Sequence, residues 1–217
     1  MDRESSLLES AKLEEKEHNW KKVAKIYEQI SKIYIENKVL AKSAKNFKKL
    51  GWAYYRSGEI IRTQEDYNEL NMLAIDAYNE AIKTYKQIKN KSQQLECLAE
   101  LNFIKGLLSD SIEQAKQAFN ESQKLFIESS DLYSEKSKKK NIARVLSRAS
   151  IALFFLITYY SESEDIEQVY QKGRDVAVRA WELSKEVNDI QSLAEALFAE
   201  RMLFFMIFSI IPFKWDE

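Results

Sequence analysis

The sequence is poor in the residues that most folds and most enzyme sites need. Its 217 residues include only four glycines and one proline. Because a β-rich or α/β fold needs many turns, this scarcity favours long helices joined by short loops. The few glycines also exclude a Gly-rich phosphate loop. A single histidine, His18, excludes a histidine-based metal site or catalytic dyad built within the chain.

Cysteine and long hydrophobic runs are scarce too. The one cysteine, Cys97, excludes an internal disulfide framework and is typical of a reducing compartment. Two apolar runs, 151–160 and 202–212, are each about half the roughly 20 residues that span a bilayer. The opening MDRESSLLES has no apolar signal-peptide core. We therefore expect a cytoplasmic protein with no transmembrane segment and no cofactor, whose apolar runs are buried helices.

Residues 20–57 set the pattern of the chain. Apolar side chains recur there at the i, i+3, i+4, i+7 spacing of an amphipathic helix. A polar break at 36–38 interrupts the pattern, with Asn37 as a residue that tolerates the left-handed conformation of a helix end. Gly51 lies inside the second helix, where it favours the close approach of another helix. Neither helix can bury its stripe alone, so we expect the two to pack against each other and against a neighbour.

The pattern returns along the chain. Pairs of aromatic residues seven apart precede a polar break and a helix rich in small residues. The pairs are Tyr27 and Tyr34, Tyr78 and Tyr85, and Phe119 and Phe126; the last copy is weaker, with Tyr170 and Trp181 eleven apart. The further helices are expected over 4–17, 59–88, 91–108, 111–128, 142–160, 165–186 and 190–210, with an N-cap at Ser109-Asp110 and an irregular start to 59–88. The pattern predicts an all-α fold.

On these hairpins the chain resembles the tetratricopeptide-repeat superfamily in its divergent, long-helix form. The opening LLESAKLEEKEHNWKKVAKIYEQISKIYIENKVLAKSAKNFKKLGWAY is also similar to the soluble NSF-attachment proteins, with a Leu-Leu-x-x-Ala lead helix, a Tyr-rich hairpin and a following helix of small residues. The resemblance implies a right-handed solenoid of antiparallel helical hairpins with about eight or nine helices. It implies one helical-repeat domain over 1–217, or the N-terminal part of a longer protein.

The net charge of −1 conceals a strong asymmetry. Residues 21–58 carry ten basic and two acidic side chains. Within this block Lys38, Lys42, Lys45 and Lys49 recur at spacings of four, three and four, which places them on one helix face with Arg56 further along the same stripe. This basic stripe would bind an acidic peptide, an anionic surface or nucleic acid, or it is a solvated face. Because lysine dominates over arginine, we expect no specific nucleic-acid recognition.

The candidate partner-binding residues extend this stripe. They are Lys38, Lys42, Lys45, Asn46, Lys49, Tyr54 and Arg56. The tetratricopeptide resemblance implies a carboxylate clamp for an acidic C-terminal peptide, with Lys42, Asn46 and Lys49 as its candidate members. Tyr54 would line a concave groove, or would pack between helices. A second basic run, Lys136–Lys140, is expected to be a solvated loop.

No catalytic constellation is present, so we expect no enzyme activity. The expected function is that of a non-catalytic intracellular scaffold or adaptor that binds a protein or acidic peptide in a helical-repeat groove. One alternative is the sensor or regulatory region of a larger signalling enzyme. Another is an attachment-protein-like adaptor in membrane fusion or trafficking. The apolar end of the chain, 202–213, would serve as a homodimer interface.

Overall fold

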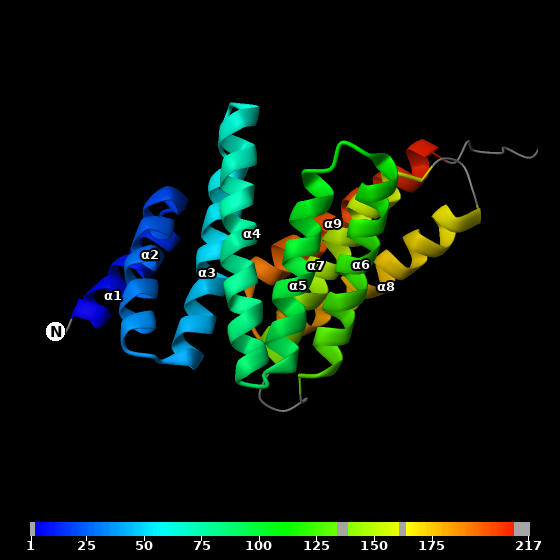
Figure 1. Cartoon of the computed structure of the whole chain (residues 1–217). Coiled ribbons are helices and arrows are strands. Elements are labelled where there is room, and N and C mark those ends of the chain that lie inside the picture. Colours follow the sequence, from blue (N-terminus) through cyan, green and yellow to red (C-terminus); the bar gives the residue numbers. More distant parts are fainter. Residues whose placement is uncertain (1–2, 134–138, 161–163, 211–217) are drawn as a thin grey trace, which may run out of the picture. The chain divides into compact units, whose positions relative to one another are not determined.

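The computed structural model describes residues 3–133, 139–160 and 164–210, apart from the side chains of 164–165 and 207–210. These segments form nine helices and contain no strand (Figure 1). The all-α prediction and the expected number of helices are therefore confirmed for this part of the chain. The helices are α1 (Arg3–Lys16), α2 (Trp20–Glu36), α3 (Leu40–Glu59), α4 (Gln64–Gln87), α5 (Lys91–Leu107), α6 (Ile112–Asp131), α7 (Lys139–Ile157), α8 (Glu164–Glu186) and α9 (Ile190–Ile210).

The chain divides into two compact units, Met1–Ile104 and Lys105–Glu217. In the first unit α1 contacts α2, α2 contacts α3, and α3 contacts α4. In the second unit α7 is central, because it contacts α6, α8 and α9. The expectation of a single repeat domain is not tested by this division and stays a prediction.

Four of the helix connections share one turn. The residue two positions before α2, α3, α5 and α9 has a left-handed backbone, with φ between 52° and 58°. In each turn the next N–H donates a 2.9–3.0 Å hydrogen bond to the carbonyl five residues back. This 6→1 bond is the Schellman closure of a helix C-terminus. The left-handed residues are His18, Lys38, Lys89 and Asn188.

The left-handed residue of the α2–α3 turn corrects a prediction. Asn37 was expected to take this conformation, but its φ is −84° and Lys38 takes it instead. In this turn the N–H that closes the 6→1 bond belongs to the residue that follows the left-handed one. The place of a residue in the turn, and not its type, therefore decides which residue is left-handed. A lysine at such a position is strained by about 1–2 kcal/mol relative to glycine.

The helix expected over 59–88 has the predicted irregular start. The helix α3 runs through Glu59 and α4 begins only at Gln64, where Thr63 accepts a hydrogen bond from the N–H of Asp66. The predicted N-cap at Ser109-Asp110 is wrong. Ser111 caps α6 by accepting from the N–H of Gln114 at 3.5 Å.

The aromatic pairs form the interior. All three strong pairs are at most 5% exposed, while Tyr170 and Trp181 are half-buried. Cys97 is fully buried. Gly51 permits the expected close approach, because a Cβ atom added to it would lie 2.9 Å from the ring of Tyr78 on α4.

The two apolar runs have different environments. Residues 151–157 lie within α7, and all but Phe155 are buried there. In α9 Leu203 is buried, whereas Phe204 and Phe205 are 50% and 64% exposed. Among the helices in the described ranges, none combines the length and the apolar character that crossing a bilayer requires.

Candidate functional site

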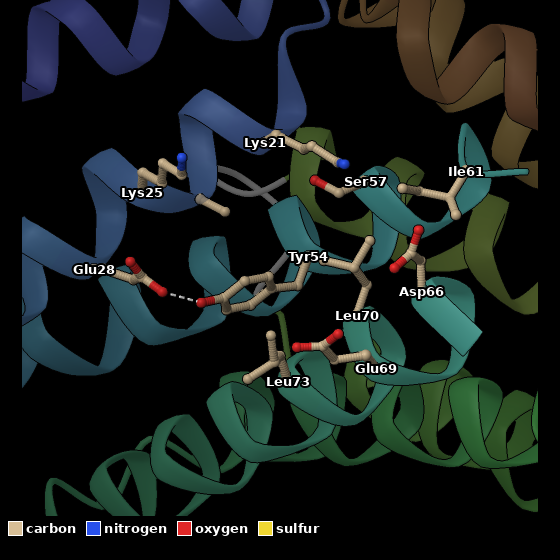
Figure 2. A pocket seen from close by; sticks show the side chains of 11 residues that line it. Lys21, Lys25, Glu28, Tyr54, Ser57, Ile61, Asp66, Glu69, Leu70 and Leu73 are labelled. Carbon is tan, nitrogen blue, oxygen red and sulfur yellow. Dashed lines mark hydrogen bonds between the residues drawn. The ribbon is translucent and has the colours of Figure 1, made fainter. Parts of the chain in front are cut away.

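A groove in the first unit brings together three helices. It has a volume of about 270 Å³ and opens between α2 and α4, with α3 at its base (Figure 2). Its lining mixes charged, aromatic and aliphatic side chains. The lining residues are Lys21, Ala24, Lys25 and Glu28 of α2, Tyr54 and Ser57 of α3, Ile61 of the connection, and Asp66, Glu69, Leu70 and Leu73 of α4.

Tyr54 is the fixed aromatic member of this groove. Its hydroxyl donates a hydrogen bond to Oε1 of Glu28, which joins α3 to α2 across the groove (Figure 2). Burial raises the pKa of Tyr54 above the ordinary tyrosine value, and the hydrogen bond and negative charge of Glu28 add to this effect. The phenol therefore stays protonated at neutral pH and serves as a hydrogen-bond donor with a set direction.

The groove has walls of opposite charge, apart from Glu28 of α2, whose carboxylate accepts the hydrogen bond of Tyr54. Lys21 and Lys25 are four residues apart on α2, so they lie on one face of that helix, and both are exposed. Asp66 and Glu69 are three residues apart on α4 and are exposed as well. Within the part of the chain that the structure describes, none of these four side chains forms an ion pair. The apolar side chains of Ile61, Leu70 and Leu73 complete the groove.

Most of the predicted basic stripe has partners inside the chain. Lys42 lies 2.7 Å from Oε1 of Glu4, and Lys49 lies 3.4 Å from Oε1 of Glu15, so both lysines meet carboxylates of α1. Arg56 makes an ion pair of 2.9 Å with Glu59. Its guanidinium also lies 5.5 Å from the ring centres of Trp20 and Trp52, at the distance of a cation–π contact.

The remaining stripe residues have separate environments. Asn46 is only 3% exposed, and its amide donates to the main-chain oxygen of Tyr27 at 2.8 Å and to Oγ of Ser31 at 2.7 Å. Lys38 lies in the α2–α3 turn, and Lys45 is exposed on α3. The structure thus brings Lys42 and Lys49 to the face covered by α1, places Tyr54 in the groove, and gives Asn46 a role in joining α2 to α3.

The partners of Lys42 and Lys49 form two matching clusters, which we name the Tyr–Lys seats. In the first seat the hydroxyl of Tyr34 donates to Glu4 at 2.9 Å, beside Lys42. In the second seat the hydroxyl of Tyr27 donates to Glu15 at 2.6 Å, and Lys49 donates to that hydroxyl at 2.6 Å.

The pKa values of both seat tyrosines are raised. Burial, followed by the hydrogen bond and charge of Glu4, raises the pKa of Tyr34 to about 12. Burial and Glu15 raise that of Tyr27 further. The sequence reasoning recognised the lysines and the tyrosines but missed the acidic residues of α1 that join them.

No metal centre is evident in the described residues. They contain no group of three or more histidine, cysteine, aspartate or glutamate side chains placed to hold a metal ion. Of the second basic run, residues 136–138 lie outside the described residues. Lys139 and Lys140 are not in a loop as expected, because they begin α7, where Lys139 pairs with Glu186 and Lys140 lies 3.4 Å from Asp189. The predicted dimer interface 202–213 is described only in part, because the side chains from 207 onward lie outside the described residues, and the interface stays a prediction.

Comparison with known proteins gives no family for this chain. No protein-family model matches it, and no curated protein is significantly similar to it.

Proposed function

We propose that this chain is a non-catalytic scaffold that holds a segment of another protein in the groove between α2 and α4. The observation that carries this proposal is the pairing of two oppositely charged walls, free of ion pairs within the described residues, with an apolar strip between them. Lys42 and Lys49, by contrast, are paired with carboxylates of α1. The four wall charges all line the same groove.

The size of the groove favours a polypeptide segment as its ligand. Small-molecule sites are clefts or cavities of roughly 300–1,000 Å³ that bury most of the ligand's surface. This groove of about 270 Å³ lies just below that range and is open to solvent, so it would accept a few side chains of a longer ligand. A protein segment can bury a few residues there and gain further contacts outside it.

The charges define the preferred order of side chains in that segment. An acidic side chain would approach Lys21 and Lys25, and a basic side chain would approach Asp66 and Glu69. Between them an apolar side chain would contact Leu70 and Leu73. The ligand is thus a dipolar segment with an apolar centre, which narrows the acidic peptide expected from the sequence.

This proposal revises the predicted site. Tyr54 remains a contact residue, since it lines the groove. Lys21 and Lys25 take the electrostatic role that the sequence analysis gave to Lys42 and Lys49, because the latter two contact α1.

We also propose that the helices form a solenoid of antiparallel hairpins, as the tetratricopeptide resemblance implies. The sequential contacts between helices and the four copies of one Schellman turn support this arrangement. In such an arrangement, consecutive helix pairs leave a groove along one face, and that face is where repeat proteins bind their partners.

Site-specific photocrosslinking would test the proposed function. A photoreactive amino acid at Leu73, inside the groove, should capture a partner from native lysate, whereas the same label at the exposed Ile112 should not. Lys21→Glu/Lys25→Glu should reduce capture at least ten-fold. The matched control Lys86→Glu/Lys91→Glu changes the charge equally at exposed positions outside the groove and should leave capture unchanged. Capture that does not depend on Lys21 and Lys25 would contradict the proposal.

A further inference from the structure

The first helix makes more polar than apolar contacts with the rest of the chain. Ala11 is the only buried residue of α1, while Leu7 and Leu8 are partly buried against the core and Leu13 is 57% exposed. The polar contacts are more extensive, since Glu4 and Glu15 occupy the two Tyr–Lys seats and Glu14 pairs with Lys22 at 3.3 Å. This helix therefore resembles a carboxylate-bearing ligand that the chain itself supplies.

We propose that the face of α2 and α3 beneath α1 is a docking site for a helix that carries carboxylates at the spacing of Glu4 and Glu15, and that α1 occupies it in cis. A helix of another protein with the same pattern would then displace α1. This site is independent of the proposed groove function, because no residue of the two seats lines the groove.

Each seat is selective for a carboxylate. The lysine ammonium and the tyrosine hydroxyl both act as donors, and Oε1 of a single glutamate accepts from the tyrosine in each case. The ammonium also lies over the tyrosine ring, at 5.6 Å from its centre for Lys42 and at 5.0 Å for Lys49. A neutral amide side chain would lose the charge interaction with the lysine and the strong acceptor for the phenol.

The spacing of α1 specifies the partner helix. Glu4 and Glu15 are eleven residues apart, which is about three helical turns. Between them Leu7, Leu8 and Ala11 contact the core cluster that contains Tyr27 and Tyr34. The fitting helix thus has carboxylates at i and i+11 and apolar residues at i+3, i+4 and i+7. These positions form one continuous stripe on a helix.

Displacement is plausible because the polar contacts of α1 are accessible to water. The side chains of Lys42 and Lys49 are 56% and 40% exposed in their ion pairs with α1. Exposed ion pairs contribute little to stability and are screened by salt. With one buried alanine and two partly buried leucines, α1 has little apolar contact that would resist exchange.

A synthetic peptide of residues 3–17 is the probe for this site. The full chain with Glu4→Gln/Glu15→Gln loses the carboxylates of its own α1 and should bind the labelled peptide at least ten-fold more tightly than the wild-type chain does. A peptide with the same two substitutions should bind at least ten-fold more weakly. When Lys42→Gln/Lys49→Gln is added to the Glu4→Gln/Glu15→Gln chain, the two peptides should bind that chain with equal affinity. Equal binding of both peptides to the Glu4→Gln/Glu15→Gln chain would overturn the proposal.

Hydrogen exchange on the wild-type chain gives a test that does not depend on any variant. An excess of the peptide should increase amide exchange in α1 while α2 stays protected, and α1 that stays equally protected would overturn the proposal. Light scattering identifies the other candidate occupant. A concentration-dependent dimer that the Glu4→Gln/Glu15→Gln variant loses would assign the site to a second copy of the chain and would overturn the assignment to another protein.

Discussion

The buried amide of Asn46 donates a 2.8 Å hydrogen bond to the main-chain carbonyl oxygen of Tyr27, and this bond joins α3 to α2. The same amide donates to Ser31, whose hydroxyl donates to that carbonyl at 2.9 Å. A residue that looks like part of a polar binding stripe in the sequence is therefore part of the contact between two helices.

Asn46→Ala should accordingly reduce stability. The substitution removes two buried hydrogen bonds and leaves a small cavity, so we expect a loss of about 2 kcal/mol in the free energy of unfolding. The neighbouring exposed Lys45→Ala should change it by less than about 0.5 kcal/mol. Chemical denaturation of both variants measures the difference. Equal stability of the two variants would show that Asn46 does not join the helices.

Gly51→Ala should destabilise the chain although alanine is the better helix former. The added Cβ would lie 2.9 Å from the ring of Tyr78, which is 1% exposed and has no room to move. Overpacking of this kind costs about 1–3 kcal/mol. In a Tyr78→Ala background the ring is absent, so the same substitution should instead stabilise by about 1 kcal/mol through helix propensity. A double-mutant cycle from denaturant midpoints tests this change of sign.

Lys89→Gly should stabilise the α4–α5 turn. Lys89 has a φ of 56°, which is strained for any residue with a Cβ. Relief of that strain exceeds the added flexibility of glycine in the unfolded chain, so we expect a gain of about 0.5–1 kcal/mol. Lys83→Gly, on the exposed face of α4, should lose about 1 kcal/mol. Thermal unfolding of the two variants should shift in opposite directions.

Stability should also fall at alkaline pH because of the seat tyrosines. The pKa of Tyr34 rises from about 10 to about 12 in the folded chain. A raised pKa means that the folded state holds its proton longer than the unfolded state, so this contribution is complete below pH 10 and is lost between pH 10 and 12. Phenolate absorbance should show Tyr34 titrating late, and Tyr34→Phe should reduce the slope of stability against pH. An unchanged slope in that variant would contradict this role of Tyr34.

The sequence was sufficient to predict the helices and the interior. The 3.6-residue periodicity depends on which side chains are buried, and Tyr27, Tyr34, Phe119 and Phe126 lie in the core as expected. The details of the turns were harder to predict, because the composition of 36–38 does not show which residue takes the left-handed conformation. The structure gives the left-handed position to Lys38 rather than to Asn37.

The candidate site was only partly predictable, for a physical reason. A helical pattern shows which lysines share a face, but not which helix covers that face. Contacts of Lys42 with Glu4 and of Lys49 with Glu15 join residues more than 30 positions apart. The groove was missed because the sequence does not show where the irregular stretch after α3 ends, and the start of α4 at Gln64 decides that Asp66 and Glu69 line the groove beside α2. Tyr54 was identified because aromatic side chains are common anchors at interfaces.

Peptide selection on the isolated chain tests the central claim of this account most directly. A random peptide library displayed on phage would be selected against the wild type and against a variant with exchanged walls, Lys21→Glu/Lys25→Glu/Asp66→Lys/Glu69→Lys. We predict that the wild type selects peptides with an acidic residue on one side of an apolar centre and a basic residue on the other. The exchanged variant, checked for unchanged helicity, should select a different set of peptides that bind the wild type at least ten-fold more weakly. Selection of the same peptides by both proteins would contradict the assignment of the groove as the binding site.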